Sequence, residues 1–339
     1  MGLGVEWYDL VCFGIVGVAF LVALWVLWNH ARSRKELGIL DERLLLENGV
    51  ALNVVPRATG QVSSYQLWTS CWRGVHPLWL LATRFSTFVI MAMFLALDVH
   101  EYDPSIFFYY TEWTFTLVMV YFALGTIVSA HGCWQLLKKP PLENGEMDEF
   151  LRRGLEDSMS TNSNGYKEKE IKGSIMLQNR YVAEEFNQIA GFWGYLMQIT
   201  YQTSAGAVIL TDIVFWGVIV PFLSISRFKL NMLMGCMHTL NAVFLLLDTA
   251  LNNLPFPWFR FAYFVLWSCA YVIFQWIIHA CGFTWWPYPF LELNTPWAPL
   301  WYFSLAVVHF PCYGLYSLIV KAKIMILPRL FPHSFLKSY

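Results

Sequence analysis

The sequence predicts an all-α, polytopic membrane protein: a bundle of about seven transmembrane helices, with the N-terminus outside and the C-terminus in the cytosol. Hydrophobic residues make up 57% of its 339 positions and charged residues only 13%, about half the charged share of soluble domains. Aromatic residues reach 18% and include 17 Trp, an excess typical of chains with rings at lipid interfaces. A soluble core of this size cannot bury so much apolar surface, so lipid is expected to cover the rest.

Seven apolar runs approach the ~20 residues that a helix needs to cross a bilayer. The run 190–222 is too long for one straight crossing, so the sequence leaves open whether it forms one span or two. Its first half is rich in Gln, Thr, Tyr and Gly and is predicted to lie at the interface or to line a cavity. The seven runs are 10–28, 77–97, 106–131, 190–222, 231–251, 261–281 and 299–320.

The orientation follows from the placement of Lys and Arg. With the N-terminus outside, 19 of the 22 Lys and Arg residues fall in segments on the cytosolic side, as the positive-inside rule requires. The expected order is an extra N-terminal span (1–28), a cytosolic loop (29–76), a six-span core (77–320) and a basic cytosolic tail (321–339). Within the core, the polar loop 138–188 is expected to be a mobile tether, with phosphorylation left open. The host membrane and the oligomeric state stay open.

Several classes of site are not expected. The 7 Cys are scattered without CxxC spacing, so neither a disulfide framework nor a zinc site is predicted. The sequence also has no phosphate-binding loop, dinucleotide fingerprint or nucleic-acid motif. We therefore expect no cofactor, no metal and no nucleic-acid partner, and membrane lipid is the expected partner.

Ionisable residues at membrane depth are costly and usually face the interior of a bundle or a cavity. Four of the predicted spans bring such a residue to a similar level in the predicted outer half. Along 231–251 the polar residues share one helix face, which is expected to point into the bundle. These groups either hydrogen-bond the helices together or carry out chemistry. The ionisable residues considered are Arg84, Glu112, Asp212, His238, Asp248 and His279, and the polar face comprises His238, Asn241, Asp248 and Asn252.

The chemical interpretation is a hydroxyl nucleophile with a histidine base. A Thr hydroxyl is hardly ionised at neutral pH and needs an adjacent base to attack an ester carbonyl. A histidine can take that proton and return it to the leaving alkoxide. Asp212 or Asn241 is placed to orient such an imidazole, as the third member of a hydrolase triad does. A site in the outer leaflet can accept a lipid sideways from the membrane.

Four motifs resemble a known family. They are Thr111–Leu117 (TEWTFTL), Tyr121–Thr126 (YFALGT), Met237–Thr249 (MHTLNAVFLLLDT) and Trp285–Glu292 (WWPYPFLE). Together they resemble the rolling stone family of multi-pass membrane proteins and its plant relatives. They are more distantly similar to the androgen-induced and androgen-dependent TFPI-regulating proteins, membrane threonine hydrolases that cleave fatty acid esters of hydroxy fatty acids. The likeness covers about 106–320, which leaves the first span as an addition.

The resemblance implies a catalytic pair. The catalytic His of the hydrolases falls on His238, and their catalytic Thr falls on Leu117, where a one-residue gap selects Thr116 and a larger shift selects Thr114. The hydrolases carry Asn-His where this chain has Met234 and Gly235. The leading hypothesis is thus a membrane hydrolase of lipid esters with Thr116 as nucleophile and His238 as base. The second-rank candidates are Asp212, Asn241, Glu112, His279 and Thr114.

Two other classes of function stay open. The first is a non-catalytic receptor or adhesion-type protein that keeps the family fold without the chemistry. The second is a transporter, suggested by Arg84 and the acidic residues within the spans. The aromatic residues of the last outer loop fit an anchoring belt better than substrate contact; they are Trp285, Trp286, Tyr288 and Trp297.

Overall fold

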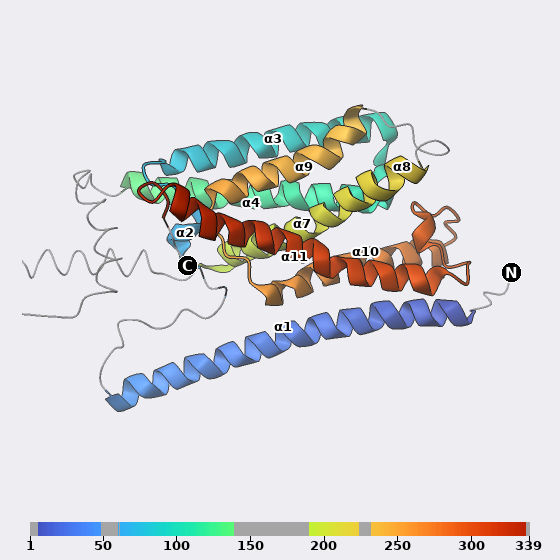
Figure 1. Ribbon diagram of the computed structural model, residues 1–339, viewed down its shortest axis with the longest axis horizontal. Coiled ribbons are helices and arrows are strands. Elements are labelled where there is room, and N and C mark those ends of the chain that lie inside the picture. The colour runs from blue at the N-terminus through green and yellow to red at the C-terminus, as the bar shows by residue number, and fades with distance from the viewer. Residues whose placement is uncertain (1–5, 49–59, 61, 139–189, 224–231, 337–339) are drawn as a thin grey trace, which may run out of the picture.

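The computed structural model describes residues 6–48, 60, 62–138, 190–223 and 232–336. The chain is helical, and seven of the described helices are long and apolar enough to cross a membrane. They run along one direction and leave the two termini at opposite ends of the bundle (Figure 1). We call the end at which α1 begins the N-face and the end at which α11 ends the C-face. The predicted all-α, seven-span class is confirmed.

The elements follow in the order of the predicted spans. Short helices and single turns connect the spans at the two faces of the bundle (Figure 1). The predicted loop 138–188 lies outside the described residues, apart from Lys138 at the end of α4. The described elements are α1 (Trp7–Asn48), α2 (Ser64–Trp68), α3 (Pro77–Tyr102), η1 (Pro104–Phe108), α4 (Tyr110–Lys138), α7 (Phe192–Val214), the π-helical turn η2 (Phe215–Ile219), α8 (Val220–Leu223), α9 (Met232–Leu251), η3 (Trp258–Arg260), α10 (Phe261–Ala280), η4 (Pro289–Leu291) and α11 (Ala298–Leu330).

The long run 190–222 forms one span, in which α7 continues through η2. The prediction that its polar first half lies at the interface or lines a cavity is wrong. That half occupies the centre of the bundle, where α7 packs against α4, α9, α10 and α11. Gln202 and Ser204 are fully buried, and the Gln202 amide nitrogen donates to the Pro255 carbonyl at 2.7 Å. Its polar residues are buried among the neighbouring helices, away from lipid, although Thr203 Oγ1 and Ser204 Oγ have no hydrogen-bond partner among the described residues.

Small residues let α7 approach its neighbours. Ser204, Ala205, Gly206 and Ala207 are buried in succession, as at close helix contacts in membranes. A Cβ atom at Gly206 would lie 2.5 Å from Cδ1 of Phe264 on α10. Only glycine therefore fits at this crossing.

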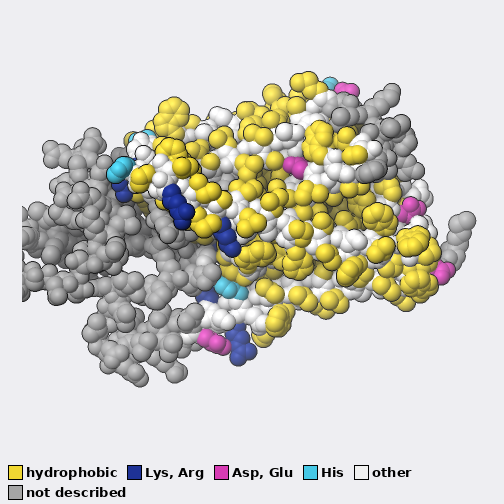
Figure 2. Space-filling model, in the orientation of Figure 1, with side chains coloured by type: hydrophobic (Ala, Val, Ile, Leu, Met, Phe, Trp, Pro, Cys, Tyr) yellow, Lys and Arg dark blue, Asp and Glu magenta, His cyan; other side chains and the backbone are white. Residues whose placement is uncertain are grey.

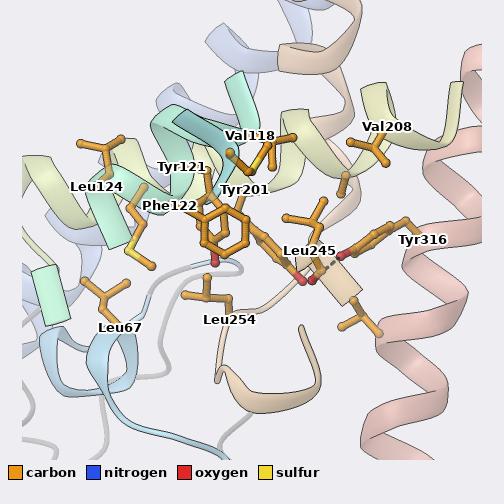
Figure 3. Packing of buried hydrophobic residues seen from close by; sticks show 14 of the residues in the cluster. Leu67, Val118, Tyr121, Phe122, Leu124, Tyr201, Val208, Leu245, Leu254 and Tyr316 are labelled. Atoms are coloured by element: carbon orange, nitrogen blue, oxygen red, sulfur yellow. Dashed lines mark hydrogen bonds between the residues drawn. The ribbon is translucent and has the colours of Figure 1, made fainter. Parts of the chain in front are cut away.

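Aromatic side chains fill the middle of the bundle. Tyr201 from α7 and Tyr316 from α11 point toward one another beside Leu245 of α9 (Figure 3). Both hydroxyls contact Thr249 Oγ1, at 2.8 Å from Tyr201 and 2.6 Å from Tyr316. A buried phenol requires such a partner, and this shared threonine links three spans.

Two predicted boundaries differ from the structure. The segment 29–76 is not a loop from its start, because α1 continues to Asn48. An exposed ion pair one turn apart, Arg32 Nε to Glu36 Oε1 at 3.0 Å, supports this extension. At the other end, α11 continues to Leu330, so the predicted tail begins within this helix, and the residues after it fold back onto the C-face. The Leu336 N–H donates to the Cys71 carbonyl at 2.8 Å, and the Phe335 ring packs against Trp72.

The surface of the bundle suits a lipid environment. Hydrophobic side chains cover most of the visible face, and the visible Lys and Arg side chains gather toward the C-face (Figure 2). Most visible Asp and Glu side chains lie toward the N-face. The positive-inside rule applied to this pattern assigns the C-face to the cytosol, and this orientation stays a prediction.

Candidate functional site

A cavity lies near the N-face, between α7, α9, α10 and α11 and the start of α4. About 580 Å³ of space, part of it open to the outside, lies between these elements. The loop around η4 lines it with Phe290 and Leu291, and α7 and η2 add further apolar side chains. Polar side chains from five helices also reach the cavity: Tyr110, Thr111, Thr211, His238, Ser268 and His309.

His238 lies in the wall of this cavity on α9 and is almost fully buried. Its ring stacks on Phe215 with centroids 3.6 Å apart and an interplanar angle of 9°. Its Nδ1 is 3.8 Å from Oδ1 of Asp212 on α7, longer than a hydrogen bond. Neither of these two atoms has a hydrogen-bond partner among the described residues. The structure thus brings the predicted base and its predicted orienting acid close together. Both atoms are buried, and Asp212 itself does not line the cavity.

The stacking partner of His238 begins the π-helical turn. The Val220 N–H donates to the Phe215 carbonyl, one residue farther back than in an α-helix. Pro221 follows directly, and a proline ring clashes with the carbonyl four residues before it in a regular α-helix. The widened turn relieves that clash, and such turns often occur at functional sites. It also presents the Phe215 ring to the imidazole.

The predicted polar face of α9 points into the bundle, as expected. His238, Asn241, Asp248 and Asn252 are all buried. Asn241 is fully buried, its Oδ1 accepts from the Ala242 N–H at 2.7 Å, and its Nδ2 has no partner in the described part of the chain. Asn241 does not line the cavity.

The α4 candidates lie beside the cavity rather than in its wall. From α4 only Tyr110 and Thr111 line the cavity, and Glu112, Thr114 and Thr116 do not. Thr114 is fully buried and Thr116 half-buried. Neither hydroxyl forms a hydrogen bond within the described ranges, nor does Glu112 Oε2. The predicted nucleophile and the predicted base are therefore both in the core, but only the base lines the cavity.

The contacts of His279 indicate a structural role. Its Nδ1 is 2.7 Å from the Gln275 carbonyl and its Nε2 is 3.1 Å from the Trp285 carbonyl. The ring stacks on Trp286 at 3.6 Å. Both nitrogens face carbonyl oxygens outside the cavity, so this histidine anchors the loop that follows α10.

The aromatic residues of the loop between α10 and α11 have two different roles. Trp285 and Trp297 are exposed near the N-face, as an anchoring belt requires. Tyr288 is buried and lines the cavity, with its hydroxyl 3.5 Å from Thr111 Oγ1. Burial raises the pKa of Tyr288 to about 12, although the hydrogen bond to Thr111 acts in the opposite direction. The phenol therefore stays a neutral donor at physiological pH.

Sequence reasoning missed most of the cavity wall, including two polar residues in hydrogen-bond contact, Ser268 on α10 and His309 on α11. Ser268 Oγ is 2.7 Å from His309 Nε2. The available signal was His309 itself, because a histidine within the run 299–320 is an ionisable residue at membrane depth. Ser268 carries no comparable signal, since a serine in an apolar span is common.

Comparison with family models, curated proteins and solved structures gives no match for this chain. The resemblance to the rolling stone family rests on the sequence motifs alone. Two of the charged residues that suggested transport, Arg84 and Asp248, have a structural explanation. Arg84 on α3 forms a buried ion pair with Asp248 on α9 and donates to the Leu67 carbonyl and the Ser129 hydroxyl.

Proposed function

We propose that this integral membrane protein hydrolyses the ester bond of a lipid in the N-face cavity, with His238 as an acid–base group. The observation that carries the proposal is that His238 lines a cavity built within apolar spans and lies next to the carboxylate of Asp212. A carboxylate beside Nδ1 favours the tautomer whose Nε2 can accept a proton. The 3.8 Å separation closes to a hydrogen bond with a small side-chain movement, as catalytic contacts often do on substrate binding.

The chemistry of the cavity fits a lipid ester. Its apolar wall suits an acyl chain, and its few polar groups can hold one ester. Tyr288, as a neutral phenol, can donate to the carbonyl oxygen on which negative charge develops. The resemblance to hydrolases of fatty acid esters of hydroxy fatty acids agrees with this class of substrate, and membrane lipid is the expected partner.

The test is hydrolysis of such an ester by the purified protein in proteoliposomes. We expect fatty acid release by the wild type and a loss of about 10²–10⁴-fold in His238→Ala, the range for removal of an acid–base group. His131→Ala is the matched control, because this histidine is exposed on α4 and does not line the cavity. An inactive wild type, or equal rates in His238→Ala and wild type, would exclude the proposed function.

A further inference from the structure

A second histidine–hydroxyl pair lines the same cavity. Ser268 of α10 and His309 of α11 lie within hydrogen-bond distance, 2.7 Å between Oγ and Nε2. His309 is buried and Ser268 half-buried. The pair thus already has the contact that a nucleophile and its base require.

The direction of each hydrogen bond follows from the chemistry of the partners. His309 Nδ1 is 2.6 Å from the Leu305 carbonyl, which can only accept, so Nδ1 must carry a proton. In a neutral imidazole Nε2 then holds the lone pair and accepts the proton of Ser268 Oγ–H. The Tyr110 hydroxyl, 2.8 Å from Ser268 Oγ, is left to donate to that oxygen. The α11 backbone therefore fixes the tautomer in which His309 acts as a base toward Ser268.

We propose that Ser268 is the nucleophile that takes the acyl group in this cavity, with His309 as its base. This inference rests on the proposed ester hydrolysis and assigns its first step to residues other than the α4 threonines. Neither Thr114 nor Thr116 lines the cavity, whereas Ser268 does and already contacts a base. His238 is then available for the second step.

The two steps balance as an ordinary acyl transfer to water. Ser268 Oγ forms a bond to the ester carbon while its proton moves to His309 Nε2. The carbon–oxygen bond to the alcohol breaks, and the alcohol leaves with that proton. His238 then takes a proton from water as the hydroxide attacks the acyl carbon. The bond to Ser268 breaks, the proton held by His238 passes to the Ser268 oxygen, and the fatty acid is released.

The alternative role for this cluster is a polar clamp that joins α4, α10 and α11. A variant of Tyr110 separates the two roles, because Tyr110→Phe removes the bond from α4 but leaves the Ser268–His309 contact. If the cluster is only a clamp, Tyr110→Phe and Ser268→Ala both lower the thermal stability of the protein. If Ser268 is the nucleophile, the covalent label is lost in Ser268→Ala and kept in Tyr110→Phe.

The experiment is covalent labelling of the purified full-length protein with a fluorophosphonate probe, followed by peptide mapping. We expect the label on Ser268 in the wild type, its loss in Ser268→Ala, and slowing by about 10²–10⁴-fold in His309→Ala. We expect the label to stay on Ser268 in Tyr110→Phe, and His131→Ala, which changes an exposed histidine on α4 outside the cavity, to label within a few-fold of wild type. The wild-type peptide map needs no variant, so a folding defect in one variant cannot hide the answer.

The outcomes separate this inference from the proposed function. Ester hydrolysis with the label on Thr114 or Thr116 overturns the inference and leaves the proposed function standing. Hydrolysis that persists in a folded Ser268→Ala protein does the same. A wild type that neither hydrolyses the ester nor takes the label overturns both.

Discussion

Arg84 Nε lies 2.8 Å from Asp248 Oδ1 in the half of the bundle toward the C-face, where the pair joins α3 to α9. Both side chains are almost fully buried. The second carboxylate oxygen of Asp248 accepts from the hydroxyl of Tyr121 and from the amide of Asn252. A charged pair with this many partners differs from the cavity near the N-face, where His238 and Asp212 keep polar atoms without partners in the described chain. The Arg84–Asp248 pair therefore holds α3 and α9 together, although Arg84 Nη2 also has no partner among the described residues.

Removal of one member of the buried pair is expected to destabilise the fold strongly. Arg84→Met leaves the Asp248 carboxylate buried without its counter-charge, which costs about 3–5 kcal/mol. The measurement is thermal unfolding in detergent, where we expect a clearly lowered Tm. Arg32→Ala, which removes one member of an exposed pair on α1, is the control and is expected to change stability by less than about 1 kcal/mol. Equal Tm values for the two variants would contradict the structural role of Arg84.

The α7–α10 crossing gives a second prediction. Gly206→Ala places a methyl group 2.5 Å from Phe264 Cδ1, and overpacking of this kind costs about 1–3 kcal/mol. Gly17→Ala on α1 is the matched control, because nothing lies within 4 Å of its Cβ position. We expect a lower Tm for Gly206→Ala and an unchanged or slightly higher Tm for Gly17→Ala. A Gly206→Ala protein as stable as wild type would show that the helices can separate there at no cost.

The sequence predicted the spans well because crossing a bilayer leaves a strong signal of length and hydropathy. It also predicted that the polar face of α9 points inward, since residues three and four apart share a helix face. It could not assign the polar half of α7 correctly. A polar residue in a span, such as Gln202, gives the same sequence signal whether it lines a cavity or donates a hydrogen bond to a neighbouring loop. Only the arrangement of the helices decides between them.

The candidate site was predictable only in part. His238 and Asp212 lie on different spans, and their expected level in the membrane brought them correctly into one site. Ser268 and His309 are also on different spans, but their pairing depends on helix rotation about the long axis. Span boundaries do not fix that rotation. For the same reason the sequence alone could not show that Thr116 lies outside the cavity wall.

Two cysteines near opposite faces test the orientation. Cys281 is exposed at the N-face end of α10, whereas Cys71 is buried toward the C-face. Burial raises the pKa of Cys71, even though Lys323 nearby acts in the opposite direction. A higher pKa means less thiolate, the reactive form, at neutral pH. We therefore expect a membrane-impermeant maleimide to label Cys281 in intact cells and Cys71 only after denaturation. The signal should fall in Cys281→Ser, with any remainder on the half-buried Cys236 of α9. Labelling of Cys281 only after permeabilisation, in cells shown to carry the protein at their surface, would reverse the orientation.

The final prediction concerns the α4 threonines, Thr114 and Thr116. Their variants distinguish the nucleophile inferred from the sequence, Thr116, from the one inferred from the structure, Ser268. Thr116→Val and Thr114→Val each remove a hydroxyl that has no hydrogen bond within the described chain, so each is expected to change stability by less than about 1 kcal/mol. If Ser268 takes the acyl group, both variants keep ester turnover within a few-fold of wild type.

The measurement is kcat and KM for ester hydrolysis by the two valine variants and by Ser268→Ala in the same liposomes. Loss of the nucleophile removes an interaction made in the transition state, so it lowers kcat and kcat/KM together. A shift in KM alone would instead indicate altered binding near the cavity. A fall in kcat of about 100-fold or more in Thr116→Val, with Ser268→Ala active, would return the nucleophile to α4. The side chain of Thr116 would then have to reach the cavity through a rotation of that helix on substrate binding.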